Sequence, residues 1–429
     1  MARQTLEARL RDEIRRRGPI PFADFMRVVL YDLDGGYYSS LDERIGPAGD
    51  FYTAPATHPA FGALLALQLE RCWELLGQPE SFTVVEEGGG KGRLAQDVFN
   101  YTQHLAADFC RAVDYRIVEF GRTGRVTAPQ DGNTGIAISW NGNTSPDEIE
   151  AGVIISNELY DAMPRHRVIQ QGETLYELLV DATDGGFIET IAQPSTPALA
   201  ERLRKLDVTL PNGSKAEIDL GGPAHLTETA SRLRRGFVFT IDYGYPAATL
   251  YDGSRREGTL LCYHHHTSST NPYIRLGRQD ITAHVDFTSL AWAGEAAGLW
   301  TEGLLTQQRY LKKLGSQAFI DALRELDLPP QDVMANRMAI LELTKPSGFG
   351  GFGVLIHSTG TEAGEPFGAD EIVISRARGG LDDLPPVLLT PDHMPLLAGR
   401  YPQYSELDSI WPVTQRPETE EINTGGTQQ

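Results

Sequence analysis

Cysteine is scarce in this chain, which has three in 429 residues: Cys72, Cys110 and Cys262. An odd and widely spaced set of this kind excludes a disulfide framework and a zinc site built on four cysteines. We therefore expect a reducing compartment and a cytoplasmic location. The adjacent histidines at 264–266 do not supply the missing ligands, because neighbouring residues cannot all face one ion, so no metal site is predicted.

The chain also lacks long apolar runs and an excess of basic residues. No apolar stretch approaches the ~18 residues that a membrane-spanning helix needs, so we expect no membrane anchor. Lysine and arginine number 38 against 58 aspartate and glutamate, which gives a formal net charge of −20. This balance argues against a general binder of nucleic acids or anionic membranes, and it would suit a cationic partner. The acidic excess is spread along the sequence, so a solubilising surface accounts for it as well.

The order of the expected elements divides the chain into three parts. Residues 1–45 have helical periodicity and end in a glycine-containing turn, so we predict an N-terminal helical lead-in. Residues 46–359 are predicted to form the main domain, with an insertion at about 165–235 that would form a substrate lobe. Residues 360–429 are rich in proline, glycine and acidic residues, and we expect them to be a partly ordered C-terminal extension.

Short apolar segments alternate with helical ones in the main domain. A helix is expected at 91–109, and strands are expected at 81–86, 115–119, 135–140, 153–157 and 237–242. Strands that are apolar over most of their length suit a parallel sheet covered by helices on both faces. The predicted fold class is therefore α/β, with a Rossmann-like core.

A glycine-rich turn follows the first of these strands. Glu86 ends the strand, and Gly88, Gly90 and Gly92 follow at intervals of two before the helix begins. Glycine allows a sharp turn and a close approach of the backbone to a ligand, and a helix N-terminus adds free N–H groups. The spacing differs from the G-x-G-x-x-G of dinucleotide enzymes and resembles the turn of class I S-adenosyl-L-methionine-dependent methyltransferases. In that turn's usual setting an acid at the end of the next strand binds the ribose hydroxyls, and Glu119 has this position.

Five colinear blocks make the sequence similar to the MidA-type methyltransferases, a family that includes a mitochondrial complex I assembly factor that methylates an arginine. The blocks are residues 49–55 with 61–62, 86–92, 157–164, 241–244 and 282–287. The resemblance implies a Rossmann-like methyltransferase core with an added lobe, S-adenosyl-L-methionine as cofactor and no metal. It implies cofactor-binding roles for Gly49, Asp50, Thr53, Glu86, Gly88, Gly90, Gly92, Glu119 and Asn157. The sequence departs from the family's pattern at Ala56, Gly89, Phe120, Gly121 and Gly353.

Methylation of an arginine sets a chemical demand that paired carboxylates can meet. A guanidinium has a pKa of about 12 or more, so it must lose a proton as it is methylated, and carboxylates can both hold it and accept that proton. Glu158 and Asp161 directly follow the strand expected at 153–157, and His284 with Asp286 forms a second candidate pair. Structural roles are the alternatives: a helix cap for Asp161 or Asp286, and a surface ion pair for Glu158.

Three functions are consistent with these patterns. The first is N-methylation of an arginine in a protein or peptide acceptor, without a nucleic-acid or membrane partner. The second is methylation of a small molecule or a natural-product peptide, which the departures at Ala56, Gly121 and Gly353 would permit. The third is a non-catalytic assembly factor that retains the fold, and the intact acids and glycines count against it. No oligomeric state is indicated by the sequence.

Overall fold

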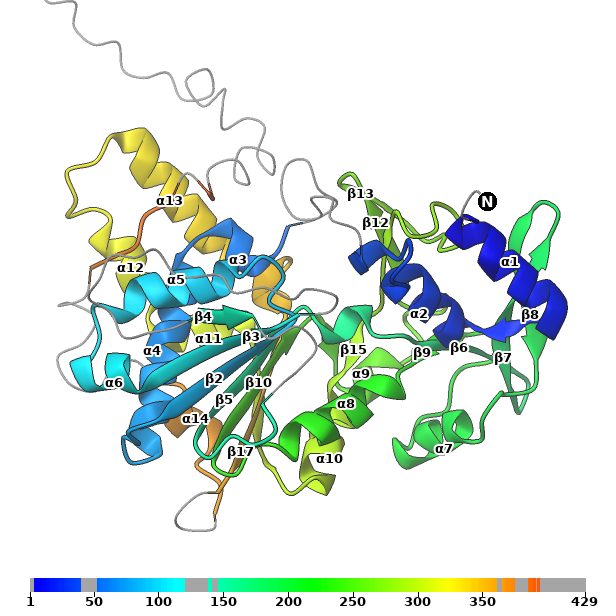
Figure 1. The fold of residues 1–429 in the computed structure, drawn as a ribbon, viewed down its shortest axis with the longest axis horizontal. Coiled ribbons are helices and arrows are strands. Elements are labelled where there is room, and N and C mark those ends of the chain that lie inside the picture. The colour runs from blue at the N-terminus through cyan, green and yellow to red at the C-terminus, as the bar shows by residue number, and fades with distance from the viewer. Residues whose placement is uncertain are drawn as a thin grey trace, which may run out of the picture.

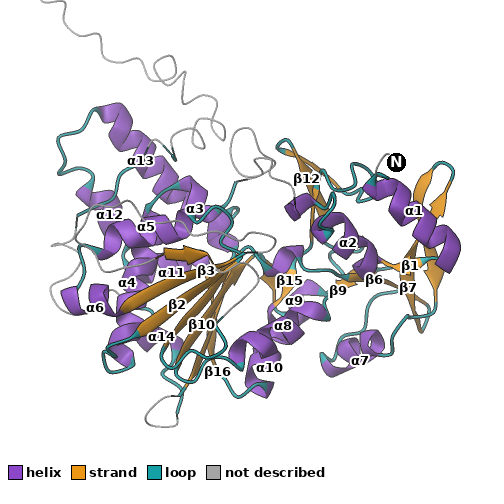
Figure 2. Ribbon diagram, in the orientation of Figure 1, coloured by secondary structure: helices purple, strands orange, loops and turns teal. Residues whose placement is uncertain are grey.

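The computed structural model describes residues 4–39, 52–119, 138–140, 146–360, 365–374, 385–390 and 392–393. These residues form a large region around a seven-stranded sheet and a smaller region around an antiparallel sheet (Figure 1). Helices lie on both sides of the large sheet, whereas strands and a few helices make up the smaller region (Figure 2).

The large sheet consists of β2 (Phe82–Glu87), β3 (Val113–Val118), β4 (Ile138–Trp140), β5 (Gly152–Asn157), β10 (Gly236–Asp242), β16 (Trp300–Thr306) and β17 (Gly353–Thr359). Its strand order is β16-β17-β10-β5-β2-β3-β4. The strands β4, β3, β2, β5 and β10 are parallel neighbours, whereas β17 runs antiparallel to both β10 and β16. This is the 3-2-1-4-5 order of doubly wound folds with two strands added, the antiparallel β17 and the edge strand β16, so the prediction of a Rossmann-like α/β core is confirmed.

The chain changes its direction of travel across the sheet at β2. β3 and β4 extend the sheet on one side of β2, and β5 with β10 extends it on the other. Doubly wound folds bind ligands outside the carboxyl ends of the strands at such a switch point. The carboxyl ends of β2 and β5 are followed by the predicted glycine turn and by Glu158, respectively, so the candidate residues lie at this point.

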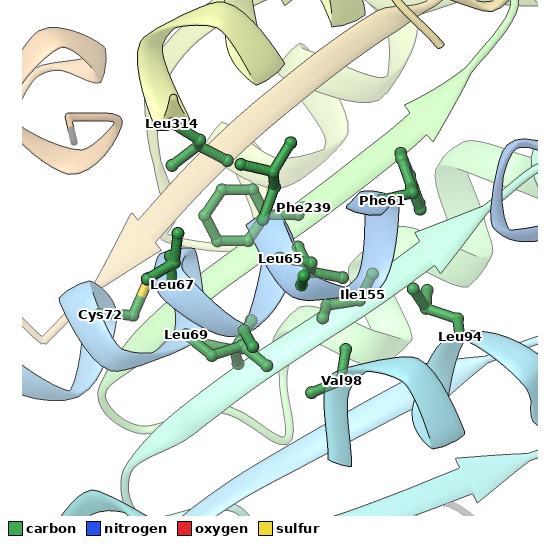
Figure 3. Packing of buried hydrophobic residues seen from close by; sticks show 14 of the residues in the cluster. Phe61, Leu65, Leu67, Leu69, Cys72, Leu94, Val98, Ile155, Phe239 and Leu314 are labelled. Atoms are coloured by element: carbon green, nitrogen blue, oxygen red, sulfur yellow. The ribbon is translucent and has the colours of Figure 1, made fainter. Parts of the chain in front are cut away.

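One face of the large sheet packs against α4 (Ala60–Leu75), α5 (Arg93–Thr102), α6 (Ala107–Ala112), α11 (Gln307–Leu314), α12 (Ser316–Ala322), α13 (Pro330–Leu343), the 3-10 helix η3 (Phe349–Gly351) and α14 (Ala369–Ile372). The other face packs against α8 (Gly221–Ala230) and α10 (Phe287–Ala296). Almost all of α4 is buried, as expected of a helix that is apolar around most of its circumference. Figure 3 shows this cluster, in which Leu65 of α4 packs with Ile155 of β5 and Phe239 of β10.

The smaller region contains β1 (Ile20–Pro21), β6 (His166–Gln171), β7 (Thr174–Thr183), β8 (Gly186–Ala192) and β9 (Lys215–Ile218), with the hairpin strands β12 (Leu261–His264), β13 (Thr267–Ser269) and β14 (Asp280–Thr282). Its helices are α1 (Leu6–Arg17), α2 (Phe22–Tyr31), the 3-10 helix η1 (Tyr37–Ser39) and α7 (Ala198–Lys205). The N-terminal segment is part of this region, because β1 pairs with β7 and the apolar side of α2 packs on Val180, Phe187 and Ile281. Three distant segments of the chain therefore form one lobe. The helix α8 lies within the insertion expected at about 165–235, but it packs on the large sheet and not in this lobe.

Short elements at the carboxyl edge of the large sheet link the two regions. They are α3 (Ala54–Thr57), the 3-10 helix η2 (Tyr160–Ala162), β11 (Gly244–Tyr245), α9 (Ala247–Leu250) and β15 (Val285–Asp286). β11 and β15 form a parallel pair. Within the described ranges, no helix combines the length and apolar composition needed to cross a membrane. The same residues include no cluster of histidine, cysteine, aspartate and glutamate that could hold a metal ion.

Part of the C-terminal extension packs on the main domain. The hydroxyl of Tyr101 in α5 donates to the carbonyl of Pro385, and the Leu389 N–H donates to Asn336 in α13. His393 lies 3.2 Å from the carboxylate of Asp97 in α5. The described part of the extension thus contacts the helix that follows the glycine turn.

Candidate cofactor and active site

The glycine turn lies at the carboxyl end of β2, and its backbone requires glycine. Gly88, Gly90 and Gly92 have φ angles of 72°, 54° and 76°, in the left-handed region that L side chains rarely adopt. Gly92 immediately precedes α5, so the N-terminus of this helix opens at the turn. The local structure matches the strand, turn and helix expected from the sequence.

Glu119 reaches the turn from the neighbouring strand. Its Oε2 accepts a 2.6 Å hydrogen bond from the Gly90 N–H. β2 and β3 are parallel and in register, with Glu86 opposite Ile117, so the ends of the two strands lie side by side. Glu119 is therefore a carboxylate at the edge of the turn, where the sequence analysis places a ribose-binding acid.

Glu86 is buried beneath the turn and is only 4% exposed. Its Oε2 accepts a 2.9 Å hydrogen bond from the Tyr115 hydroxyl, and a Cβ atom on Gly89 would lie 3.0 Å from its Cδ. Burial raises the pKa of Glu86 to about 8, although the hydrogen bond from Tyr115 opposes the shift. Its carboxyl group thus packs directly against the backbone that shapes the turn.

Glu158 ties a second segment to the carboxyl end of β5. Its Oε1 accepts hydrogen bonds from the Ala54 N–H and from Asn157 Nδ2, each at 3.1 Å. Ala54 opens α3 and follows Thr53, so the predicted Thr53 and Asn157 meet on either side of Glu158. Glu158 has a φ of 53°, a strained backbone conformation for a non-glycine residue of the kind found at functional sites. The predicted Gly49 and Asp50 lie outside the described residues.

Asp161 lies in η2 and is 5% exposed. Its Oδ2 accepts a 2.5 Å hydrogen bond from the Tyr243 hydroxyl. Its Oδ1 is buried and has no hydrogen-bond partner in the described part of the chain. Burial raises the pKa of Asp161, against the opposing effects of the Tyr243 hydrogen bond and the positive charge of Arg165. A buried carboxylate with a raised pKa and an available oxygen can act as a general base.

Asp242, at the end of β10, positions η2. Its Oδ2 accepts the backbone N–H groups of Tyr160 at 2.9 Å and Asp161 at 3.2 Å. Burial raises the pKa of Asp242 well above its usual range, and the charges of Asp161 and Glu158 add to the shift. Asp242 has no predicted role, although its position at the end of a strand expected at 237–242 was a usable signal.

Arg165 is a buried cation behind η2 that the sequence analysis did not select. Its Nη2 donates to the Tyr160 carbonyl at 2.6 Å, and its Nη1 lies 3.0 Å from Asp219 Oδ2. Both side chains are nearly inaccessible to solvent, so the pair is a buried ion pair that breaks at a high cost if one partner is removed. Arg165 therefore anchors η2 and contributes positive charge near Asp161.

The candidate pair His284 and Asp286 is divided between two environments. The His284 ring meets the Tyr243 ring edge to face, with centroids 5.5 Å apart. Burial, with the charges of Arg255 and Arg165, lowers the pKa of His284 to about 4, so its imidazole is neutral near pH 7. Asp286 instead caps α10.

The cap occupies both oxygens of Asp286. Oδ1 accepts the N–H groups of Thr288 and Ser289 at 3.1 and 3.2 Å, and Oδ2 accepts the Ser289 hydroxyl. This is the structural alternative considered for Asp286, because an N-cap carboxylate satisfies the free N–H groups of the first helical turn. The structure brings His284 next to Tyr243 and directs the Asp286 carboxylate toward the helix.

The groups at the switch point fit the chemistry of S-adenosyl-L-methionine. The glycines leave the turn without side chains except at Lys91, and Glu119 provides a carboxylate acceptor for hydroxyl groups. Asn157 Oδ1 is a buried acceptor without a hydrogen-bond partner among the described residues, which suits an N–H group of a ligand. Acceptors that suit hydroxyl groups and an amino group therefore lie beside a glycine-rich turn.

Comparisons with known proteins agree with this site. A family model described as S-adenosyl-L-methionine-dependent methyltransferase matches residues 64–305. A mitochondrial protein arginine methyltransferase NDUFAF7 homolog from Drosophila melanogaster is 26% identical over 380 residues, which cover 81% of this chain and 83% of the relative. Human mitochondrial protein arginine methyltransferase NDUFAF7 is 25% identical over 348 residues, covering 74% and 75% of the two chains.

A solved structure extends the similarity over most of the fold. A protein from Burkholderia thailandensis, crystallised with S-adenosyl-homocysteine, is 30% identical with a TM-score of 0.73, covering 87% of this chain and 95% of that one. The cytoplasmic location predicted from the cysteine content is contradicted by the curated relatives, which are named as mitochondrial proteins. Sparse cysteines indicate a reducing environment but do not select one compartment. The chain belongs to the family of S-adenosyl-L-methionine-dependent methyltransferases whose model matches residues 64–305, and its cofactor is S-adenosyl-L-methionine.

Proposed function

We propose that this methyltransferase transfers a methyl group to a guanidinium nitrogen of an arginine in a protein or peptide. The names of the fly and human relatives support this acceptor. The observation that carries the proposal is the environment of Asp161, whose Oδ2 is held by Tyr243 and whose buried Oδ1 has no partner among the described residues. Such a carboxylate suits an acceptor that must both be held as a cation and lose a proton.

Asp161 is the general base of the proposed reaction. The cofactor supplies an electrophilic methyl group on a sulfonium centre. A guanidinium nitrogen must lose one proton as it gains the methyl group, and Asp161 Oδ1 accepts that proton. A raised pKa makes the ionised Asp161 a stronger base than an exposed aspartate, and the positive charge of the acceptor favours the ionised form.

Glu158 and His284 complete the acceptor side of the proposed site. Glu158 holds Ala54 and Asn157, so it fixes α3 against the end of β5 at the boundary between cofactor and acceptor. The neutral His284 packs on Tyr243 and contributes a ring nitrogen, Nδ1, that is buried and unpartnered within the described residues. Asp286 contributes indirectly, by capping the helix that follows His284.

The cofactor is assigned to the residues around the switch point. We place it on the turn at Gly88, Gly90 and Gly92, with Glu119 at the ribose and Asn157 at an amino group. Glu86 supports this turn from below. Thr53 lies beside α3, and Gly49 and Asp50 retain the role that the family resemblance implies for them.

Labelling with methyl-labelled S-adenosyl-L-methionine tests the acceptor. The protein is incubated with a lysate from its source organism, and the labelled proteins are hydrolysed and separated by chromatography. We expect label in methylarginine, and we expect most of it to be lost when Asp161→Asn replaces the wild-type protein. Label confined to a small-molecule fraction, or to another amino acid, would contradict an arginine acceptor. Cofactor binding without any labelling would favour a non-catalytic assembly factor.

A further inference from the structure

The backbone and ring of Tyr243 are fixed by neighbours on several elements. Its N–H donates to Asp242 Oδ1 at 2.8 Å, and its carbonyl accepts the Val285 N–H at 3.0 Å. The ring packs against His284 and, with centroids 5.3 Å apart, against Phe352. These contacts leave the phenol little freedom, so they determine where its hydroxyl lies.

The hydroxyl of Tyr243 meets one oxygen of Asp161. It donates to Oδ2, while Oδ1 is buried without a hydrogen-bond partner in the described ranges. Burial and the charges of Asp161 and Asp242 raise the pKa of Tyr243 well above its usual range, so the phenol stays protonated. A protonated phenol has one hydrogen to donate, and here it is directed to a carboxylate.

We propose that Tyr243 is a positioning residue for Asp161, whose Oδ2 it holds so that Oδ1 receives the proton of the acceptor. The proposal rests on the proposed function, in which Asp161 is the base. In the reaction, the guanidinium nitrogen forms a bond to the methyl carbon and the carbon–sulfur bond breaks, with the electron pair going to sulfur. The nitrogen's proton goes to Asp161 Oδ1, so charge and atoms balance: a carboxylate becomes a carboxylic acid and the sulfonium becomes a thioether.

The hydrogen bond also sets the basicity of Asp161. Other titratable groups interact with Asp161 from the elements around it, namely Arg165, Asp242, Tyr31 of α2, Tyr38 of η1 and Tyr263 of β12, and Glu158 acts on two of them, Asp242 and Tyr263. Arg165 favours the ionised form of Asp161. The charge of Asp161 in turn raises the pKa of the neighbouring Asp242. Replacing only the Tyr243 hydroxyl leaves all of these groups in place. It removes the hydrogen bond to Asp161 and the contact of the same hydroxyl with the Thr282 side chain, and only the first of these acts directly on the Asp161 carboxylate.

The substitution Tyr243→Phe tests this role. It keeps the ring contacts but removes the donor to Oδ2, so the pKa of Asp161 should rise by about one unit. Activity requires the ionised base, so the acid limb of the pH–rate profile should move to higher pH by the same amount. At a fixed pH on that limb the rate should fall about tenfold, with unchanged affinity for S-adenosyl-homocysteine.

Tyr310→Phe is the matched control. Tyr310 is a fully buried tyrosine in α11, and its hydroxyl has no hydrogen-bond partner among the described residues. This control removes a buried hydroxyl from the core and should leave the pH–rate profile unchanged. A shift shared by both variants would indicate a general structural effect and would overturn the positioning role of Tyr243.

Two measurements separate this proposal from the proposed function. Carboxyl ¹³C NMR of protein labelled at aspartate gives the pKa of Asp161, with its signal identified by its loss in Asp161→Asn. The initial rate of label incorporation into the lysate protein fraction gives the pH profile. An inactive Asp161→Asn together with an unshifted Tyr243→Phe overturns the role of Tyr243 alone. An active Asp161→Asn overturns the base assignment, and with it both proposals.

The wild-type protein provides a test that does not depend on any variant. The Tyr243 hydroxyl proton should exchange slowly with water, because the phenol is buried and donates to Asp161. NMR of protein labelled at tyrosine Cζ detects slow exchange as a separate signal for the protonated and deuterated forms. Rapid exchange of this hydroxyl would overturn the proposal even if Tyr243→Phe failed to fold.

Discussion

The substitution Gly90→Val tests the cofactor site through the backbone. Gly90 has a φ of 54°, and its N–H donates to Glu119. A valine kept in this conformation costs ~1–2 kcal/mol or more, because its branched side chain meets the backbone. A valine that moves to negative φ reorients its N–H and loses the bond to Glu119, at a cost of about 1.5–3 kcal/mol for a charged acceptor.

Either outcome weakens the turn that is assigned to the cofactor. We expect the affinity for S-adenosyl-homocysteine to fall by about 2–3 kcal/mol, which is roughly 30- to 150-fold. Isothermal titration calorimetry measures this loss directly. Thermal unfolding with and without the ligand gives an independent value, because a ligand that binds only the folded state raises the melting temperature.

Gly172→Val provides the control for backbone strain. Gly172 has a φ of 59°, and a Cβ atom there would meet nothing within 4 Å. It lies in the turn between β6 and β7, in the smaller lobe, so its substitution should lower stability but leave ligand affinity unchanged. A folded Gly90→Val with wild-type affinity, or an equal loss in both variants, would refute the assignment of the turn.

Three further predictions concern the acidic residues Glu119, Asp286 and Glu86. Glu119→Ala should weaken binding of S-adenosyl-homocysteine by about 1–3 kcal/mol in calorimetry, and unchanged binding would exclude a ribose contact. Asp286→Ala should lower the free energy of unfolding by about 0.5–2 kcal/mol through loss of the helix cap, whereas a large loss of kcat at unchanged stability would assign Asp286 to the chemistry. Glu86 has a folded pKa of about 8, above its ordinary value of 4.5. The free energy of unfolding therefore falls as the pH rises from about 4.5 to about 8. Glu86→Gln should therefore gain melting temperature relative to the wild type between pH 5 and pH 9, and a relative loss would contradict the raised pKa.

The glycine turn could be predicted because its signals are local. A short apolar strand, glycines at intervals of two and an amphipathic helix occupy consecutive positions, and each follows from the chemistry of a few neighbouring residues. The position of Glu119 also follows, since a helical segment and one strand separate it from Glu86. The helix expected at 91–109 is divided into α5 and α6, with the break after Thr102.

The acceptor side depends on contacts that the sequence does not reveal. Tyr243 and Asp161 lie 82 positions apart, and their contact depends on how η2 packs beside the end of β10. The N-terminal lead-in joins the lobe through the pairing of Ile20 with Val180, which no local pattern indicates. The cap at Asp286 was open to prediction, because an acid directly before a helix is a common N-cap.

In the proposed reaction Asp161 accepts the proton of an arginine acceptor. This role is tested by comparing Asp161→Asn with the wild-type protein in two assays, calorimetric binding of S-adenosyl-homocysteine and formation of labelled methylarginine. Asparagine retains an oxygen that can accept from the Tyr243 hydroxyl but cannot act as the base. We predict unchanged ligand affinity and loss of most methylarginine formation. Wild-type methylarginine formation by Asp161→Asn would contradict the role of Asp161 as the base.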